Sequence, residues 1–274
     1  TAGCCCNASI PSAPCGTYLL GNAWSATSNG RWNSSKIRTE GEQPVLSNFP
    51  TWSIRKPENT RPDAVCKVGG APIGWPRDWP ACALCNLPMS FLGQFTGDPL
   101  APRLASGQTL FLFTCEHDSG CDFWDPVNGA NACVLIPHDE LGAHPTPIPE
   151  ETPVLLELWV SSWTSRDDAL PAKPGDSPQP TPEEDLFTKA GGTPYWTDNG
   201  PGYRIDPSDQ MVLQIDTWVT VSDGQEALEA QAARFPDRAY TIKNRASIAN
   251  LCSDGIAFVM THEGEPEIYL MVNR

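Results

Sequence analysis

The stretch "KVGGAPIGWP", Lys67–Pro76, returns later in the chain as "KAGGTPYW", Lys189–Trp196. Adjacent glycines followed by a proline fit neither a helix interior nor a central strand, because glycine favours positive φ and proline lacks an N–H donor. Each phrase precedes an apolar strand pattern with a glutamine, "MSFLGQF" or "MVLQID", and then a Ser-x-Gly or Ser-Asp-Gly sequence and another apolar strand. Three matched features in the same order indicate an internal duplication.

We expect each phrase to form a corner of a sheet module, after which Trp75 or Trp196 folds back onto the sheet. Neither phrase has the Gly-x-Gly-x-x-Gly or Gly-x4-Gly-Lys context of a phosphate loop, so a scaffold turn is favoured. A buried amide needs hydrogen-bond partners, so the glutamines are expected to tie each turn to its strand. The predicted turn and strand residues are Gly69, Gly70, Pro72 and Gln94 in the first copy, and Gly191, Gly192, Pro194 and Gln214 in the second.

Among 274 residues there are 28 prolines and 22 glycines, which indicates many turns and few long helices. Strand-like patterns cover residues 89–95, 109–115, 154–163 and 211–221, and residues 255–261 and 267–272 resemble a hairpin. One helix is predicted in "SDGQEALEAQAARFP", with Ser222 and Gln225 as a capping box and Pro236 as its end. The predicted fold is α+β and β-rich, with duplicated antiparallel sheet modules, few helices and long proline-rich loops.

We expect four segments within one globular unit. Residues 1–60 form an irregular arm that includes the thiol-rich "CCC", and residues 61–163 form the first repeat. Residues 164–186 are a proline-rich linker or loop, and residues 187–274 form the second repeat. In the second repeat, the predicted helix is inserted between the glutamine strand and the last strands.

The net charge of −15 is placed unevenly. Residues 137–274 hold 23 acidic and 9 basic side chains, whereas residues 1–136 are close to neutral. This disfavours direct nucleic-acid binding and favours a basic protein partner; a solvated acidic surface that only confers solubility is the alternative. No apolar run approaches the ~18 residues of a membrane span, and no signal-peptide pattern opens the chain. A cytoplasmic protein without a membrane partner is expected.

The pair Cys82-x2-Cys85 is typical of half a tetrahedral zinc site. Cys115 and Cys121 could complete it, with His117 as a substitute, if strands 89–95 and 109–115 pair. Such a closed site would be structural. Disulfides and free thiols remain alternatives for the 11 cysteines, and the second repeat has no matching cysteines.

Catalysis finds little support in the sequence. There are four histidines, and neither Gly-x-Ser-x-Gly nor His-Glu-x-x-His occurs. The acidic pairs Glu150–Glu151 and Asp167–Asp168 lie in proline-rich segments and are expected to be solvated. We therefore predict that the chain is not an enzyme.

The segments "VGGAPIGWP", "WPACALCNLPMSFLGQF" and "GQTLFLFTCE" resemble the YwqG-like family of bacterial proteins. They are also similar to the zinc-binding amino-terminal portion of programmed-cell-death-2 type proteins, and "KAGGTPYW", "MVLQID" and "GIAFVM" fit the YwqG-like pattern as well. The resemblance implies a duplicated β-rich α+β fold and fixes no activity. The family is similar to some immunity proteins encoded beside toxins of contact-dependent secretion systems. Its eukaryotic relatives look like chaperones for a basic ribosomal protein.

Three hypotheses follow. The first is a non-enzymatic immunity protein that occludes a basic antibacterial toxin, such as a nuclease, through its acidic second half. The second is a zinc-dependent chaperone for a basic protein of the ribosomal type. The third is a hydrolase with an unrecognised carboxylate site.

Overall fold

The computed structural model describes residues 45–58, 60–97, 100, 106–118, 120–168, 187–196, 205, 208–235, 240–251, 255–262 and 268–273. All of them belong to one compact unit, residues 35–274. The expected irregular structure of residues 1–44, with its cluster of three cysteines, lies outside these ranges, as does most of the predicted linker.

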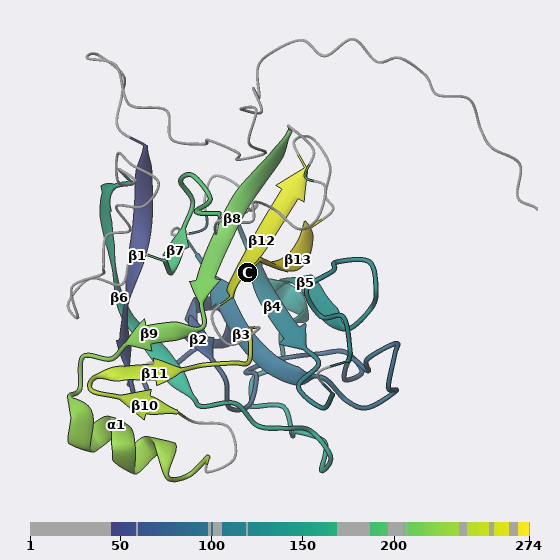
Figure 1. The fold of residues 1–274 in the computed structure, drawn as a ribbon, viewed down its shortest axis with the longest axis horizontal. Helices are drawn as coiled ribbons and strands as arrows, with labels where there is room; N and C mark the ends of the chain where they lie inside the picture. Colours follow the sequence, from purple (N-terminus) through teal and green to yellow (C-terminus); the bar gives the residue numbers. More distant parts are fainter. Residues whose placement is uncertain are drawn as a thin grey trace, which may run out of the picture. The chain divides into compact units, whose positions relative to one another are not determined.

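Ten strands form one antiparallel sheet in the order β13-β12-β8-β7-β1-β6-β2-β3-β4-β5 (Figure 1). The predicted β-rich α+β class with few helices is confirmed. The strand bounds are β1 Leu46–Ser53, β2 Lys67–Val68, β3 Ser90–Thr96, β4 Gln108–Thr114, β5 Asn131–Pro137, β6 Leu158–Asp167, β7 Lys189–Ala190, β8 Asp209–Asp216, β12 Ile256–His262 and β13 Ile268–Asn273. The 3-10 helices Pro62–Ala64 and His138–Glu140 lie in connections between the strands.

The strand order is symmetric about the β1–β6 pair, with four strands on either side. From β6 outward the order is β2, β3, β4, β5, and from β1 outward it is β7, β8, β12, β13. The strands of the two sequence repeats therefore occupy matching places on either side of the centre, which gives the sheet a repeat-like structure. Strands β5 and β13, at the two ends of this order, also lie close together, and the backbone N–H of Val272 donates to the carbonyl of Trp124 across 3.1 Å.

One central strand was missed by the sequence reasoning. Residues 46–53 were expected within an irregular arm, yet they form β1, which pairs with β6 along its whole length. The stretch "LSNFPTWS" contains buried Phe49 and Trp52 but also a proline and four polar residues, which obscure the alternation of a strand. Its neighbours β6 and β7 supply the context that makes it a strand.

A small second sheet is inserted into the second repeat. It contains β9 (Trp218–Thr220), β11 (Arg245–Ser247) and β10 (Thr241–Ile242), and the helix α1 (Gln225–Ala232) follows β9 in the chain. The predicted strand 211–221 is thus divided at Thr217 between two sheets. The predicted capping box is wrong: the helix begins after Gly224, and the Ser222 hydroxyl instead donates to the carbonyl of Trp52.

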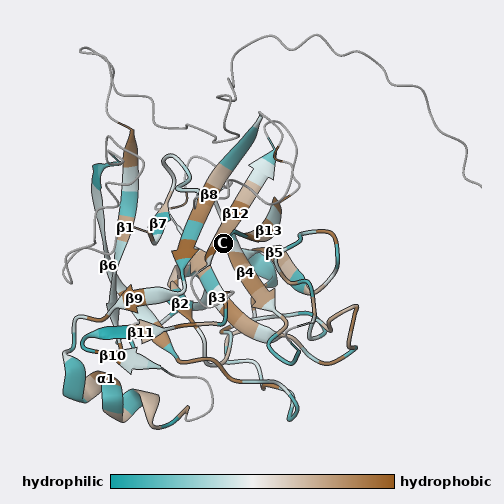
Figure 2. Cartoon of the chain, viewed as in Figure 1, coloured by the Kyte–Doolittle hydropathy of each residue, from teal (hydrophilic) through white to brown (hydrophobic). Residues whose placement is uncertain are grey.

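The main apolar cluster joins residues of the large sheet to residues of this insert. All seven residues of β3 are buried, and hydrophobic colours run along β3 and β4 in Figure 2. Val219, Leu228 and Ile248 of the insert belong to the same apolar cluster as residues of these two strands. Because both faces are covered, these strands read as continuous apolar runs and not as alternating ones. Within the described residues, no helix has the length and apolarity needed to cross a membrane.

Candidate functional site

Four cysteines meet at one end of the β3–β4 hairpin. Cys82 and Cys85 precede β3, whereas Cys115 directly follows β4 and Cys121 lies in the next loop. Ser90 at the start of β3 pairs with Thr114 at the end of β4, so the antiparallel register brings both cysteine pairs to the same place. The pairing of these two strands, on which the expected site depended, is therefore present.

The sulfur atoms of this cysteine cluster all lie within 4.8 Å of one another. The Sγ atoms of Cys85 and Cys115 are 3.7 Å apart, and all four thiols are free of disulfides. Three of the side chains are buried and Cys85 is half-buried. His117, the expected substitute ligand, lies outside the cluster, and its Nε2 is 2.8 Å from the carbonyl oxygen of Pro88. The four cysteines are thus a possible metal site.

The local backbone around Cys82 resembles the tight turns that hold metals. The carbonyl of Cys82 accepts a 2.8 Å hydrogen bond from the N–H of Asn86. Asn86 has a positive φ of 60°, which lets the chain turn at this point. Burial raises the pKa of the Cys82 thiol, but hydrogen bonds from the backbone of Cys85 and Leu84 and from the side chains of Cys115 and Cys85 together leave the pKa below its ordinary value. Charged thiolates are favoured by such donors.

The other buried thiols behave in the opposite way. Burial raises the pKa values of both Cys115 and Cys121 above their ordinary value. Without a cation these two groups therefore stay protonated at neutral pH. A bound metal would displace their protons, so its affinity would increase with pH.

The two glycine corners form equivalent hydrogen bonds at equivalent residues. We call Lys67–Pro76 the first corner and Lys189–Trp196 the second. In the first, Lys67 pairs with Gln94, whose Oε1 accepts a 2.8 Å bond from the N–H of Ile73. In the second, Lys189 pairs with Gln214, whose Oε1 accepts a bond of the same length from the N–H of Tyr195.

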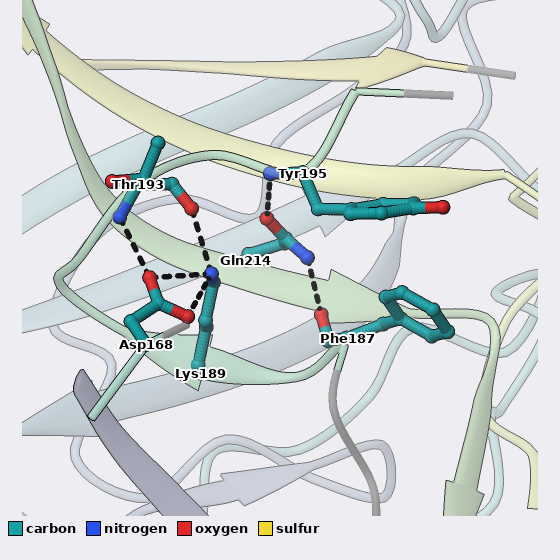
Figure 3. Close-up of polar contacts among 6 residues, drawn as sticks. All are labelled: Asp168, Phe187, Lys189, Thr193, Tyr195 and Gln214. Atoms are coloured by element: carbon teal, nitrogen blue, oxygen red, sulfur yellow. Dashed lines mark hydrogen bonds and ion pairs between the residues drawn. The ribbon is translucent and has the colours of Figure 1, made fainter. Parts of the chain in front are cut away.

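The amide nitrogens of the two glutamines also bind backbone groups of the corners and of neighbouring segments. Gln94 Nε2 donates to the carbonyls of Ile73 and Pro62, and Gln214 Nε2 donates to that of Phe187 across 2.8 Å (Figure 3). Both side chains are fully buried. Each glutamine therefore holds its corner against the neighbouring strand through backbone groups that would otherwise be buried without a partner.

Sequence reasoning missed the lysine that begins each corner. Lys67 and Lys189 are both fully buried, and each Nζ donates to the carbonyl four residues on, Ala71 at 2.7 Å or Thr193 at 2.6 Å. Burial lowers the pKa of the Lys67 ammonium, an effect that Glu157 partly offsets. The signal was available, because both quoted phrases begin with lysine beside apolar residues.

The two lysines take their counter-ions from different places. Lys67 forms an ion pair with Glu157, which directly precedes β6. Lys189 binds both oxygens of Asp168, at 2.6 and 2.7 Å, and Asp168 also accepts a bond from the N–H of Thr193 (Figure 3). Asp168 was expected to be solvated with its neighbour Asp167; that prediction is wrong, because Asp168 is buried against the second corner.

The sheet register explains the difference. In the first half, Val68 pairs with Leu158, and the residue before Leu158 is Glu157. In the second half, Ala190 pairs with Asn48, and the residue before Asn48 is Ser47. The Ser47 hydroxyl has no hydrogen-bond partner among the described residues, and Asp168, which directly follows β6, supplies the carboxylate to Lys189. The acid lies close to the second glycine of each corner. A Cβ on Gly192, whose φ is +77°, would be 2.2 Å from Asp168 Oδ2 and 1.8 Å from Ser47 Oγ.

The tryptophans after the corners contact equivalent phenylalanines. Trp75 lies 5.2 Å from Phe111, and Trp196 lies 4.4 Å from Phe258, measured between ring centroids. Phe111 pairs with Gln94, and Phe258 pairs with Gln214. The repeated pattern therefore includes lysine, two glycines, glutamine, tryptophan and phenylalanine.

A polar cluster at the edge of the second half was also missed. His262 Nδ1 lies 3.0 Å from Asp209 Oδ1, and the Tyr269 hydroxyl donates to Asp209 Oδ2 across 2.7 Å. Ser208 Oγ lies 3.1 and 3.2 Å from the two ring nitrogens of His262. A nucleophilic serine would instead lie in line with one ring nitrogen, so this geometry is not that of a serine–histidine–aspartate triad.

No protein-family model matches the chain, and no curated protein matches it at a significant level. The resemblance to the YwqG-like and programmed-cell-death-2 type families therefore stays a prediction. The residues that carry it are those of the two corners and the cysteine cluster.

Proposed function

We propose that this chain is a non-enzymatic binding protein for a basic protein partner. The observation that carries the proposal is the charge of the exposed surface in residues 137–274. Among the described residues of this segment, two basic side chains are exposed, Arg234 and Lys243. Seven acidic side chains are exposed there: Asp139, Glu140, Glu150, Glu151, Asp167, Glu226 and Glu229. Such a surface repels phosphate and attracts lysine-rich and arginine-rich proteins.

The internal charges support a scaffold role for the rest of the chain. Lys67 and Lys189 are used inside the corners, each paired with a carboxylate and a carbonyl. These groups hold the two halves of the sheet in shape and leave the surface carboxylates to meet a partner. In its specific form, we propose an immunity protein that covers the basic nucleic-acid-binding cleft of a toxin.

Binding to the product of the neighbouring gene tests this proposal. Calorimetric titration should give a specific complex that weakens as salt is raised, because screening shortens the Debye length from about 10 Å at 0.1 M to about 3 Å at 1 M. A neutral protein of similar size serves as the control titrant. Absence of binding, or binding that salt does not change, would contradict the proposal.

We also propose that the cysteine cluster holds one structural zinc ion. Zn–S bonds of about 2.3 Å place the sulfurs of a tetrahedral site about 3.8 Å apart. The 3.7 Å between Cys85 and Cys115 fits that spacing closely, and the remaining sulfurs need small movements from within 4.8 Å. Four thiolates leave no open position for water, so the metal would fix the two loops and would not act on a substrate.

Elemental analysis of the purified chain tests the metal. We expect equimolar zinc in the wild type and its loss in a Cys82→Ser variant, together with a lower melting temperature. Cys133→Ser is the matched control, because Cys133 is a free cysteine on β5 outside the cluster. A wild-type chain without zinc, or a Cys82→Ser variant with unchanged metal content, would count against the site.

The cysteine cluster also favours a second candidate, a zinc-dependent chaperone for a basic protein of the ribosomal type. The two candidates share an acidic binding surface and differ in the partner. Affinity capture that returns a ribosomal protein, and no binding to the neighbouring gene product, would favour the chaperone.

A further inference from the structure

Exposed apolar side chains lie on the two loops that form the cysteine cluster. Large hydrophobic side chains that are exposed are few among the described residues, and three of them lie on the loops that carry the cysteines. Leu84 is 51% exposed, Trp124 39% and Val127 72%. We call these three residues the knuckle surface.

Backbone contacts hold the two loops of the knuckle surface together. The N–H of Ala83 donates to the carbonyl of Gly129 across 2.8 Å, which joins the turn of Leu84 to the loop of Val127. Trp124 follows the buried Phe123, and their rings are 5.4 Å apart in an edge-on arrangement. Cys121, on the same loop, meets Cys82 in the cluster. The apolar side chains are therefore carried on a fixed frame and not on independent tails.

The surroundings of the knuckle surface are acidic. Asp118, Asp122 and Asp125 lie on the same loop, and their carboxylates accept hydrogen bonds from N–H groups of that loop. These bonds orient the carboxylates but do not neutralise them. The sequence from residue 104 to residue 165 contains nine acidic residues and no lysine or arginine.

We propose that the knuckle surface docks a basic segment of the partner protein that also carries apolar side chains. The inference rests on the proposed function, and it assigns the contact to the cysteine loops in addition to the acidic second half. Apolar side chains of the segment would cover Leu84 and Val127, where burial gains roughly 25 cal/mol per Å². Its lysines and arginines would face the three aspartates. A fixed frame loses little entropy on binding, which favours such a contact.

Charge selects this occupant over a second copy of the chain. Each copy carries a net charge of −15, so two acidic surfaces would repel each other at the same loop. Anionic lipid is disfavoured for the same reason. A cationic and apolar polypeptide satisfies both features of the surface.

A synthetic peptide that alternates lysine or arginine with leucine is the probe, and a peptide with glutamate in place of each cation is its control. The purified chain should bind the basic peptide and not the acidic one. A Leu84→Ser/Val127→Ser variant should bind about tenfold more weakly, a loss of about 1.4 kcal/mol. The matched control is Tyr240→Ser/Ile242→Ser, since these side chains are 68% and 62% exposed elsewhere on the molecule.

The outcomes separate this inference from the proposed function. Failure of the basic peptide to bind, equal binding of the acidic peptide, or equal affinities of the two serine variants would overturn the knuckle surface. Equal metal content and melting temperature in all variants exclude an effect of unfolding. If the peptide binds as expected but the neighbouring gene product does not, the proposed toxin partner fails while the docking surface stands.

Discussion

Replacing Lys189 with methionine should lower the free energy of unfolding by about 3–5 kcal/mol. Methionine fills a similar volume, so the change removes the ammonium with little loss of packing. The Lys189 side chain has no exposed area and that of Asp168 is 5% exposed. The substitution therefore leaves a carboxylate without its counter-charge in a site that water barely reaches, and it also leaves the carbonyl of Thr193 without its donor.

The first corner provides an internal comparison. The side chain of Glu157 is 28% exposed, so water can solvate its carboxylate after a Lys67→Met substitution. We expect a smaller loss there, about 1–3 kcal/mol. Urea unfolding followed by tryptophan fluorescence measures both values. The corresponding fall in melting temperature for Lys189→Met is about 6–20 °C in a unit of this size.

A double variant identifies the cause. Lys189→Met combined with Asp168→Asn keeps an oxygen that can accept from the N–H of Thr193 while it removes the buried charge. It should regain roughly half of the loss. The reasoning would be refuted if Lys189→Met were no more destabilising than Lys67→Met, or if the double variant were less stable than the single one.

Three further predictions concern single positions. Gly224→Ala should cost about 1–3 kcal/mol, because its backbone conformation is one that only glycine adopts readily. Gly192→Ala should destabilise the fold more than this, because it also has positive φ and a Cβ there would meet Ser47 and Asp168; equal melting temperatures would contradict this. Gln214→Leu should lower the free energy of unfolding by about 1–3 kcal/mol, since it leaves two buried backbone groups unpaired. Urea unfolding measures this loss, with the equally sized Gln225→Leu change as the control. Burial raises the pKa of Asp216 from 3.8 to about 6, so the folded state binds the proton more tightly and wild-type stability falls as pH rises from 4 to 6. Asp216→Asn should remove this fall, with a gain of up to about 3 kcal/mol at pH 7, and parallel pH profiles for the two chains would disprove the assignment.

The periodic and repeated parts of the sequence were sufficient for much of the fold. The strand-like runs that contain Gln94 and Gln214 became β3 and β8, and the apolar runs that follow them became β4 and β12. The four cysteines also come together, because one hairpin register places them at the same end. These features depend on local pattern and on neighbouring strands, which a sequence displays directly.

The missed features depend on distant contacts. Strand β1 acquires its extended form from β6, more than a hundred residues away, and its own pattern is interrupted by Pro50. Asp168 looked like half of a solvated acidic pair, since nothing nearby in the sequence indicates the lysine that it meets. Gly224 displaced Ser222 as the helix N-cap because the serine hydroxyl is held by β1.

The symmetric strand order has a consequence for how the two corners form as the chain is synthesised. The first corner finds its acid and its neighbouring strand within residues 45–168, whereas the second corner needs Ser47, Asn48 and Asp168 from that earlier part. Because synthesis runs from the N-terminus, β1, β6 and Asp168 leave the ribosome before Lys189 does. The strand and the counter-ion that the second corner needs are therefore available when that corner forms. The two corners follow the same pattern, yet only the second takes its counter-ion and its neighbouring strand from residues of the other half.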